Sequence, residues 1–220
     1  MNKNKWINIV TWGLALLPLA VTALLYTRLP ATIPGQWHPD GTVRYDPKWN
    51  IWMIAGMGPF LAVLFVLLPK IDPRRTNYRK FGEYYDAFVM VMMVFCGTMT
   101  GIILSESFYP GRISVGRVTT AMVGLLFVFL GNMMPKMKNN FFMGIRTPWT
   151  LSDPDVWNRT HRLGGILWFA GGLLTVALAL CGISETLMFV LLMVLVAVLA
   201  LVPTVYSYLC FRAKGQANGE

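Results

Sequence analysis

Six long stretches of the chain carry no Asp, Glu, Lys or Arg, and this feature limits the possible folds most strongly. A helix of about 20 residues spans about 30 Å, which is the thickness of the hydrocarbon core of a bilayer. An open sheet would leave edge amides unpaired in lipid, and the stretches lack the alternation of barrel strands. We therefore predict an all-α integral membrane protein with six transmembrane helices. The six uncharged stretches are residues 6–27, 49–69, 87–105, 118–135, 163–184 and 186–211.

The cations are divided unevenly between the two sides that these helices define. Charged residues make up 13% of the chain, about half the share in soluble domains, yet the net charge is +9. If the N-terminus is cytoplasmic, 14 of the 19 Lys and Arg residues lie on the inner side, as the positive-inside rule requires. The first stretch is longer than the apolar part of a signal peptide, so we expect it to be retained. We predict a multi-pass protein with both termini inside, whose cations meet membrane lipids and bind no nucleic acid directly.

Two connections are longer than a helical hairpin needs, and they suggest two regions of the chain. We predict that residues 1–69 form an N-terminal helical hairpin with a structured extracytoplasmic loop over residues 28–48. Residues 70–220 would form a four-helix region with a long cytoplasmic loop over residues 135–162, which we name the signature loop. A shorter cytoplasmic connection, residues 70–86, is named the basic loop, and we expect it to lie against anionic lipid head groups.

The outer loop contains turn residues and no helical pattern. The pair Asp40-Gly41 is typical of a tight turn, and Val43 and Tyr45 follow it at strand spacing. Trp37 suits the membrane–water interface. We therefore expect a folded loop with a short extended segment after the turn.

The signature loop should change from irregular structure to helix in its second half. Ser152 and Asp155 form a capping pattern, and Pro154 lies in the first turn, where its missing N–H costs nothing. A helix should therefore begin near Asp153. We expect it to run along the membrane surface and to enter the fifth span around Gly164-Gly165, so that one surface helix precedes that span.

The sequence contains no pattern that indicates catalysis or a bound metal. No charged residue or histidine lies in the middle of a predicted span, which counts against ion-coupled transport. His38 lies outside and His161 inside, so the two histidines cannot share a metal site. We find no nucleophile, phosphate-loop or metalloprotease motif. We therefore predict a protein that is not an enzyme and has no cofactor.

Two other functions stay open at this point. The chain could be a small transporter or flippase for a neutral or lipid-like substrate, with a water-filled cavity in the bundle. It could also be a membrane enzyme, if the signature loop brought Asp153, Asp155 and His161 together around a metal. The residues that would line the transport cavity are Asn8, Asn50, Thr98 and Asn132.

A binding surface on the signature loop explains its composition better. Aromatic side chains and arginines dominate recognition patches, and this loop has both. Trp157 and His161 are four residues apart and would share one helix face. The alternative is a segment that only anchors to lipid. We predict a polar, partly buried platform between spans four and five, with the candidate residues Asn132, Lys136, Asn140, Arg146, Trp149, Trp157, His161 and Arg162.

The signature loop and its flanks contain three consecutive motifs. Gly131–Lys136 reads G-N-x-x-P-K, Gly144–Leu151 reads G-I-R-T-P-W-T-L, and Val156–Gly165 reads V-W-x-x-T-H-R-x-G-G. This long pattern resembles the signature of the SdpI family, bacterial membrane proteins named after the immunity protein of the sporulation-delaying toxin system. The outer loop resembles the short uncharacterised domain that precedes the signature in longer family members. That second match rests on Leu29-Pro30, Ile33-Pro34, His38, Gly41 and Tyr45.

The resemblance implies a protein of the bacterial cytoplasmic membrane that protects a producing cell against a secreted antimicrobial peptide toxin. It also implies that the toxin-bound protein holds a cytoplasmic winged-helix autorepressor at the membrane. The outer loop would then meet the toxin and the signature loop the repressor. We expect Arg146→Ala and His161→Ala to weaken immunity while membrane levels stay intact. The candidate toxin-facing residues are Trp37, His38, Asp40 and Tyr45.

Overall fold

The computed structural model describes residues 5–217, and six long helices account for most of them. All six are long and apolar enough to cross a membrane, so the predicted helical, six-span architecture is confirmed. Their bounds are α1 Lys5–Leu25, α2 Ile51–Ile71, α4 Gly82–Phe108, α5 Val115–Met133, α7 Pro154–Leu180 and α8 Glu185–Ala217. The shorter elements are the 3₁₀ turns η1 Tyr26–Arg28, η2 Lys48–Asn50 and η3 Met134–Lys136, the helices α3 Arg75–Tyr78 and α6 Pro148–Ser152, and the strands β1 Thr32–Trp37 and β2 Val43–Pro47.

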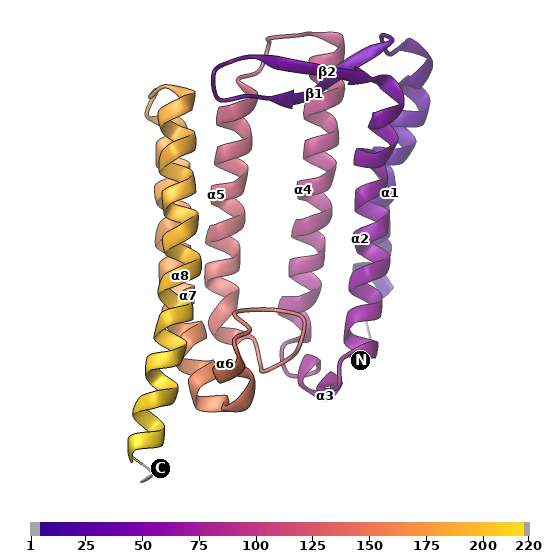
Figure 1. Cartoon of the computed structure of the whole chain (residues 1–220). Helices are drawn as coiled ribbons and strands as arrows, with labels where there is room; N and C mark the ends of the chain where they lie inside the picture. Colours follow the sequence, from indigo (N-terminus) through magenta and orange to yellow (C-terminus); the bar gives the residue numbers. More distant parts are fainter. Residues whose placement is uncertain (1–4, 218–220) are drawn as a thin grey trace.

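The shorter elements gather at two opposite ends of the helix bundle (Figure 1). The strands β1 and β2 lie across one end, which we name the hairpin face. The helices α3 and α6 lie at the other end, near both ends of the chain, and we name this end the terminal face. The two long predicted loops are therefore on opposite sides of the bundle.

The long helices pack in two groups of three. The helices α1, α2 and α4 contact one another, α7 packs against both α5 and α8, and α4 and α5 meet less closely. The backbones of α5 and α7 approach very closely, since a side chain on Gly124 would lie 2.9 Å from the carbonyl oxygen of Gly172. Helix packing thus places α4 in one group with α1 and α2. The division of the chain into regions 1–69 and 70–220 remains a prediction.

The hairpin is an antiparallel pair of strands that packs on the helix ends. Trp37 lies opposite Val43 across the pair, and the expected extended segment at Val43 and Tyr45 is confirmed. Ile33 of β1 is buried and attaches the hairpin to the helices. The buried side chains around it are Leu29, Ile51, Ile103 and Leu104.

The helix α7 begins where its capping pattern predicts. It starts at Pro154, and the Asp153 side chain accepts the backbone N–H groups of Asp155 at 2.7 Å and Val156 at 3.2 Å. These bonds satisfy donors that have no partner within the helix. The helix start near Asp153 is confirmed, with Asp153 itself as the cap.

The helix α7 then continues without a break through Gly164 and Gly165, where we expected a surface helix to meet the fifth span. Both glycines are buried in close packing, because a side chain on Gly164 would lie 2.6 Å from Ile145 and one on Gly165 would lie 2.7 Å from Pro135. The two glycines therefore allow Ile145 and Pro135 to pack closely against α7, and the helix does not turn at this point. The separate helix before the fifth span is the short α6, which Thr147 caps.

Candidate functional site

The basic loop and the signature loop meet at the terminal face, and Asp72 lies at the centre of this contact. Asp72 is only 2% exposed. Its Oδ1 accepts the backbone N–H of Arg74 at 2.6 Å. Its Oδ2 accepts the backbone N–H of Phe141 at 2.9 Å and the hydroxyl of Tyr78 at 3.1 Å. Three donors satisfy this buried carboxylate, so Asp72 holds the two loops together.

Asn140 is fully buried beside this carboxylate and shapes the signature loop. Its side-chain oxygen accepts the backbone N–H groups of Phe142 at 3.0 Å and Met143 at 2.7 Å. The Tyr78 hydroxyl lies 3.3 Å from the same oxygen, so its single proton is shared between Asn140 and Asp72. Burial and the nearby Asp72 carboxylate raise the pKa of Tyr78, which therefore stays protonated and able to donate.

Arg74 joins the two loops a second time. Its guanidinium donates to the side-chain oxygen of Asn139 and, at 2.9 Å, to the carbonyl of Leu151. The same group lies 4.7 Å from the ring centroid of Phe141, within the range of a cation–π contact. Asn77 donates to the Asn139 carbonyl at 2.7 Å. Arg74 and Asn77 of the basic loop are thus hydrogen-bonded to the signature loop. Our expectation that the basic loop anchors to lipid does not hold for Arg74.

His161 and Trp157 form a second buried cluster on the first turns of α7. Their rings stack with centroids 3.9 Å apart. The backbone N–H of Ile145 donates to His161 Nε2 at 3.0 Å, so the imidazole proton is on Nδ1, which donates to the Trp157 carbonyl at 2.8 Å. The Trp157 indole donates to the Met137 carbonyl at 3.0 Å. Gly144 has a φ of +97° and lies directly against the His161 ring, where no side chain fits.

The signature loop is also fixed to α8. The Thr147 side chain accepts the N–H of Thr150 at 3.1 Å as the cap of α6, and its oxygen lies 2.9 Å from the Ser207 hydroxyl. The ring of Trp149 packs 5.1 Å from the ring of Tyr208. The signature loop is therefore held by the basic loop and by α8 as well as by the start of α7.

The eight candidate residues of the platform differ in exposure. Asn140, Trp157 and His161 are buried, and their side chains bond to backbone groups of the signature loop and α7. Arg146 is exposed, and its guanidinium donates to the Phe141 carbonyl at 2.6 Å. The buried residues thus support the loop, and the exposed ones are available for contact. Lys136 and Trp149 are half-buried, and Asn132, Arg146 and Arg162 are exposed.

Four residues of the basic loop belong to this site, although sequence reasoning did not select them. They are Asp72, Arg74, Asn77 and Tyr78. The available signal was Asp72, the one acid among the cations of residues 70–80. Its partner lies 69 positions away, which no local pattern indicates.

The hairpin face carries a separate cavity of about 230 Å³. Three of the four toxin-facing candidates, Trp37, His38 and Tyr45, line it. The carboxylates of Glu106 and Glu185 line the same cavity from the ends of the long helices. The cavity therefore combines aromatic surface with acidic groups.

Both acidic residues of this cavity are hydrogen-bonded. Glu106 is buried and accepts the backbone N–H groups of Gly111 at 2.8 Å and Ile113 at 3.1 Å. Glu185 accepts the hydroxyl of Ser114 at 2.7 Å. These bonds orient the two carboxylates on the turn between α4 and α5.

The fourth toxin-facing candidate, Asp40, belongs to the hairpin turn and does not line this cavity. Its carboxylate accepts both the backbone N–H and the hydroxyl of Thr42, at 2.9 and 2.7 Å, and these bonds lower the pKa of Asp40. The neighbouring Pro39 carbonyl accepts the hydroxyl of Thr186 at 2.8 Å, which attaches the turn to α8.

For neither of the two other functions does the described structure bring the full set of candidate residues into one site. Asn8 and Thr98 line different cavities, at the terminal face and beside α1 and α4. Lys214 bonds to Asp153 at 2.6 Å and to Asp155 at 2.9 Å, and this contact lowers the pKa of Asp153. Within residues 5–217, no three His, Cys, Asp or Glu side chains are placed to hold a metal.

The fold and the two loop sites define a multi-pass helical membrane protein with a folded segment at each end of its bundle. Residues 136–207 match the SdpI/YfhL protein family. The chain is also similar to the Immunity protein SdpI of Bacillus subtilis (strain 168), with 22% identity over 203 residues, covering 91% of this chain and 95% of that protein. The resemblance to the SdpI family is thus confirmed. No solved structure shows significant similarity to the chain.

Proposed function

We propose that this protein is an immunity protein of the bacterial cytoplasmic membrane, which protects its cell against a secreted antimicrobial peptide toxin. The observation that carries this proposal is the similarity to the Bacillus immunity protein, which extends over nearly the whole of both chains. A match of that extent includes both long loops as well as the spans. The proposed activity is binding, and it requires no catalytic group.

The proposed orientation places the terminal face in the cytoplasm and the hairpin face outside. Of the 18 cations that the structure describes, 13 lie at the terminal face and its flanking helix ends, and five lie at the hairpin face. Cytoplasmic segments of membrane proteins show this excess. In this orientation a secreted peptide reaches the hairpin first.

The cavity at the hairpin face is the proposed contact site for the toxin. Tyr45 is 52% exposed, and Trp37 and His38 lie beside it. Exposed aromatic groups around a hollow are typical of peptide recognition. Glu106 and Glu185 favour a cationic group of the peptide in that hollow.

The terminal face is the proposed contact site for a cytoplasmic partner, such as a winged-helix repressor. The buried residues Asn140, Trp157 and His161 give the signature loop a fixed conformation. Arg146 and Arg162 are exposed on this support. A partner surface with exposed acidic groups would complement them.

The proposal is tested by deleting the gene in the producing strain and measuring growth at increasing toxin concentration. We expect the deletion to lower the tolerated concentration and the intact gene on a plasmid to restore it. Unchanged tolerance, with the protein shown to be present in the parent strain, would refute the immunity function. Repressor binding is tested separately, by co-purification of the repressor with the membrane fraction in the presence and absence of toxin.

A further inference from the structure

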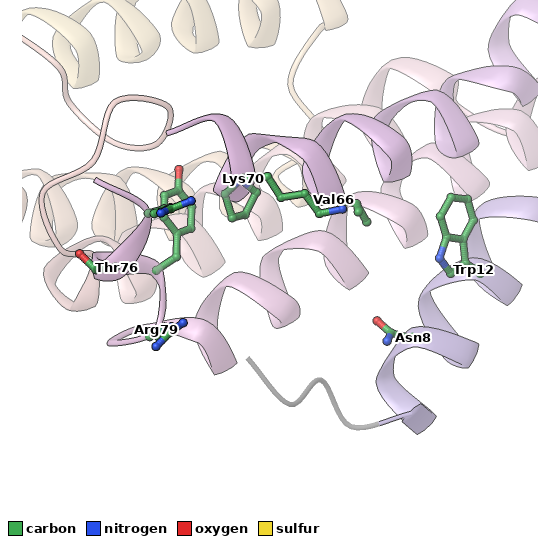
Figure 2. Close-up of a pocket in the computed structure, with 9 residues that line it drawn as sticks. Asn8, Trp12, Val66, Lys70, Thr76 and Arg79 are labelled. Carbon is green, nitrogen blue, oxygen red and sulfur yellow. The ribbon is translucent and has the colours of Figure 1, made fainter. Parts of the chain in front are cut away.

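A cavity of about 830 Å³ lies at the terminal face, where α1, the end of α2 and α3 surround it. Figure 2 shows Arg79 and Thr76 at one end, Asn8 and Trp12 of α1 at the other, and Lys70 and Val66 of α2 between them. This volume is in the range of sites that hold small organic ligands. The cavity is separate from the hairpin cavity and from the exposed arginines of the signature loop.

Three of the residues that line this cavity are cations that form no ion pair with another residue the structure describes. Lys70, Arg75 and Arg79 are exposed and make no ion pair with another described residue. No carboxylate belongs to the described lining, and Asp86 lines a narrow neighbouring space of about 10 Å³ that shares Asn8, Trp12 and Val66 with this cavity. Arg74 contrasts with these three cations, because its guanidinium is bound by the signature loop. The basic loop thus binds the signature loop through Arg74 and lines the cavity with Lys70, Arg75 and Arg79.

The remaining wall of the cavity is apolar and belongs to the spanning helices. Trp12 of α1 and Val66 of α2 line it. Lys70 lies next to the end of α2 at the terminal face, whereas Trp12 and Val66 lie deeper in the helix bundle. Trp12 is 36% exposed, so a hydrocarbon chain can reach it. The cavity therefore has a cationic end at the membrane surface and an apolar end within the membrane.

We propose that this cavity is a binding site for an anionic phospholipid. The phosphate would lie among Lys70, Arg75 and Arg79, and the acyl chains would lie along Trp12 and Val66. Cations that line one cavity without forming ion pairs repel each other, so a phosphate in the cavity would relieve this repulsion. The hydroxyl of Thr76 and the amide of Asn8 add hydrogen-bond donors to the same lining.

The same site connects the lipid to the contact between the two loops. Tyr78 lines the cavity, and its hydroxyl lies 3.1 Å from Asp72 and 3.3 Å from Asn140. A lipid that holds α3 in place therefore stabilises the basic loop against the signature loop. This inference does not depend on the immunity function.

The test measures lipid binding by native mass spectrometry of the purified full-length protein in detergent. The added probes are dioleoyl-phosphatidylglycerol, dioleoyl-phosphatidylcholine and inorganic phosphate. We expect phosphatidylglycerol to bind at least about tenfold more tightly than phosphatidylcholine, because each cation near the site contributes about fivefold. Equal binding of the two lipids would overturn the proposal. Binding of inorganic phosphate as tight as that of phosphatidylglycerol would overturn its lipid part.

Two neighbouring cations provide a matched pair of variants. Arg79 lines the cavity and Lys80 does not, although both are exposed on the same turn. We expect Arg79→Gln to weaken phosphatidylglycerol binding about fivefold and Lys80→Gln to leave it unchanged. If both variants lose the same affinity for phosphatidylglycerol, the binding depends on general surface charge, and the proposed site is wrong.

A triple variant tests the whole cationic end. Lys70→Gln/Arg75→Gln/Arg79→Gln should abolish the preference for phosphatidylglycerol. A control of equal charge change on the same face is Lys138→Gln/Arg159→Gln/Arg212→Gln, which should keep it. If the triple variant unfolds, Trp12→Ala tests the apolar wall, and unchanged affinity in that variant would contradict the proposed path of the acyl chains.

Discussion

The backbone N–H of Phe141 donates to the carboxylate of Asp72 at 2.9 Å, although 69 positions separate the two residues. This hydrogen bond links the connection after the second span to the connection after the fourth. Because Asp72 is buried, its carboxylate oxygens depend on these protein donors in place of water. The two loops therefore depend on each other for their conformation.

Asp72→Ala should lower the free energy of unfolding by about 1–3 kcal/mol, because it leaves buried backbone N–H groups without an acceptor. Tyr78→Phe removes one of the same donors and should cost about 1 kcal/mol. The double variant should cost less than the sum, since both changes act on one network. Denaturant unfolding in detergent measures these values. Additive losses would show that Asp72 and Tyr78 act separately. The control is Asp155→Ala, which removes a carboxylate from an exposed ion pair.

Gly144→Ala should destabilise the signature loop more than Gly111→Ala destabilises its own turn. Both glycines have a positive φ, +97° and +77°, so both substitutions carry a backbone cost of about 1–2 kcal/mol. Only the side chain at position 144 would also meet His161, whereas position 111 has open space. Thermal unfolding of the two variants compares them directly. Equal decreases in the unfolding temperature would mean that the His161 ring moves to accommodate the new side chain.

The sequence determines the spans and the local caps well, because these depend on short-range physics. Gaps between charges predict all six helices, and the Asp153 cap correctly predicts the start of α7. The contact between the basic and signature loops could not be found in this way. Arg74 and Arg75 are adjacent and chemically alike, yet one is docked and the other lines a cavity. Their difference arises from the tertiary path of the chain, which periodicity and composition do not encode.

His161→Ala should reduce the amount of folded protein, which revises the expectation from the sequence. Its imidazole accepts the N–H of Ile145 and stacks on Trp157, and truncation of a large buried side chain costs about 3–5 kcal/mol. The exposed variants Arg146→Ala and Arg162→Ala should keep normal membrane levels and weaken partner binding. Immunoblots of membrane fractions together with co-purification separate the two effects. Normal abundance of His161→Ala would contradict the supporting role of the imidazole.

The contact between α7 and α8 should weaken at acidic pH. The hydrogen bond from Lys214 lowers the pKa of Asp153 below its ordinary value of 3.8. A lowered folded-state pKa gives stabilisation that is present above the unfolded value and is lost as the pH falls through the folded value. Asp153→Asn keeps the N-cap and removes the titration. Between about pH 6 and pH 3, the unfolding temperature of the wild type should fall more than that of Asp153→Asn, and parallel curves would refute the contribution of this pair.

Tyr45→Ala should weaken protection against the toxin, because Tyr45 is an exposed aromatic residue on the wall of the hairpin cavity. Trp49 offers a control, since it is 56% exposed close to the hairpin but does not line this cavity. A central aromatic contact typically contributes about 1–2 kcal/mol, so the tolerated toxin concentration should fall about tenfold for Tyr45→Ala. It should stay near the wild-type value for Trp49→Ala. Equal tolerance of the two variants, at matched membrane levels, would exclude the hairpin cavity as the toxin contact.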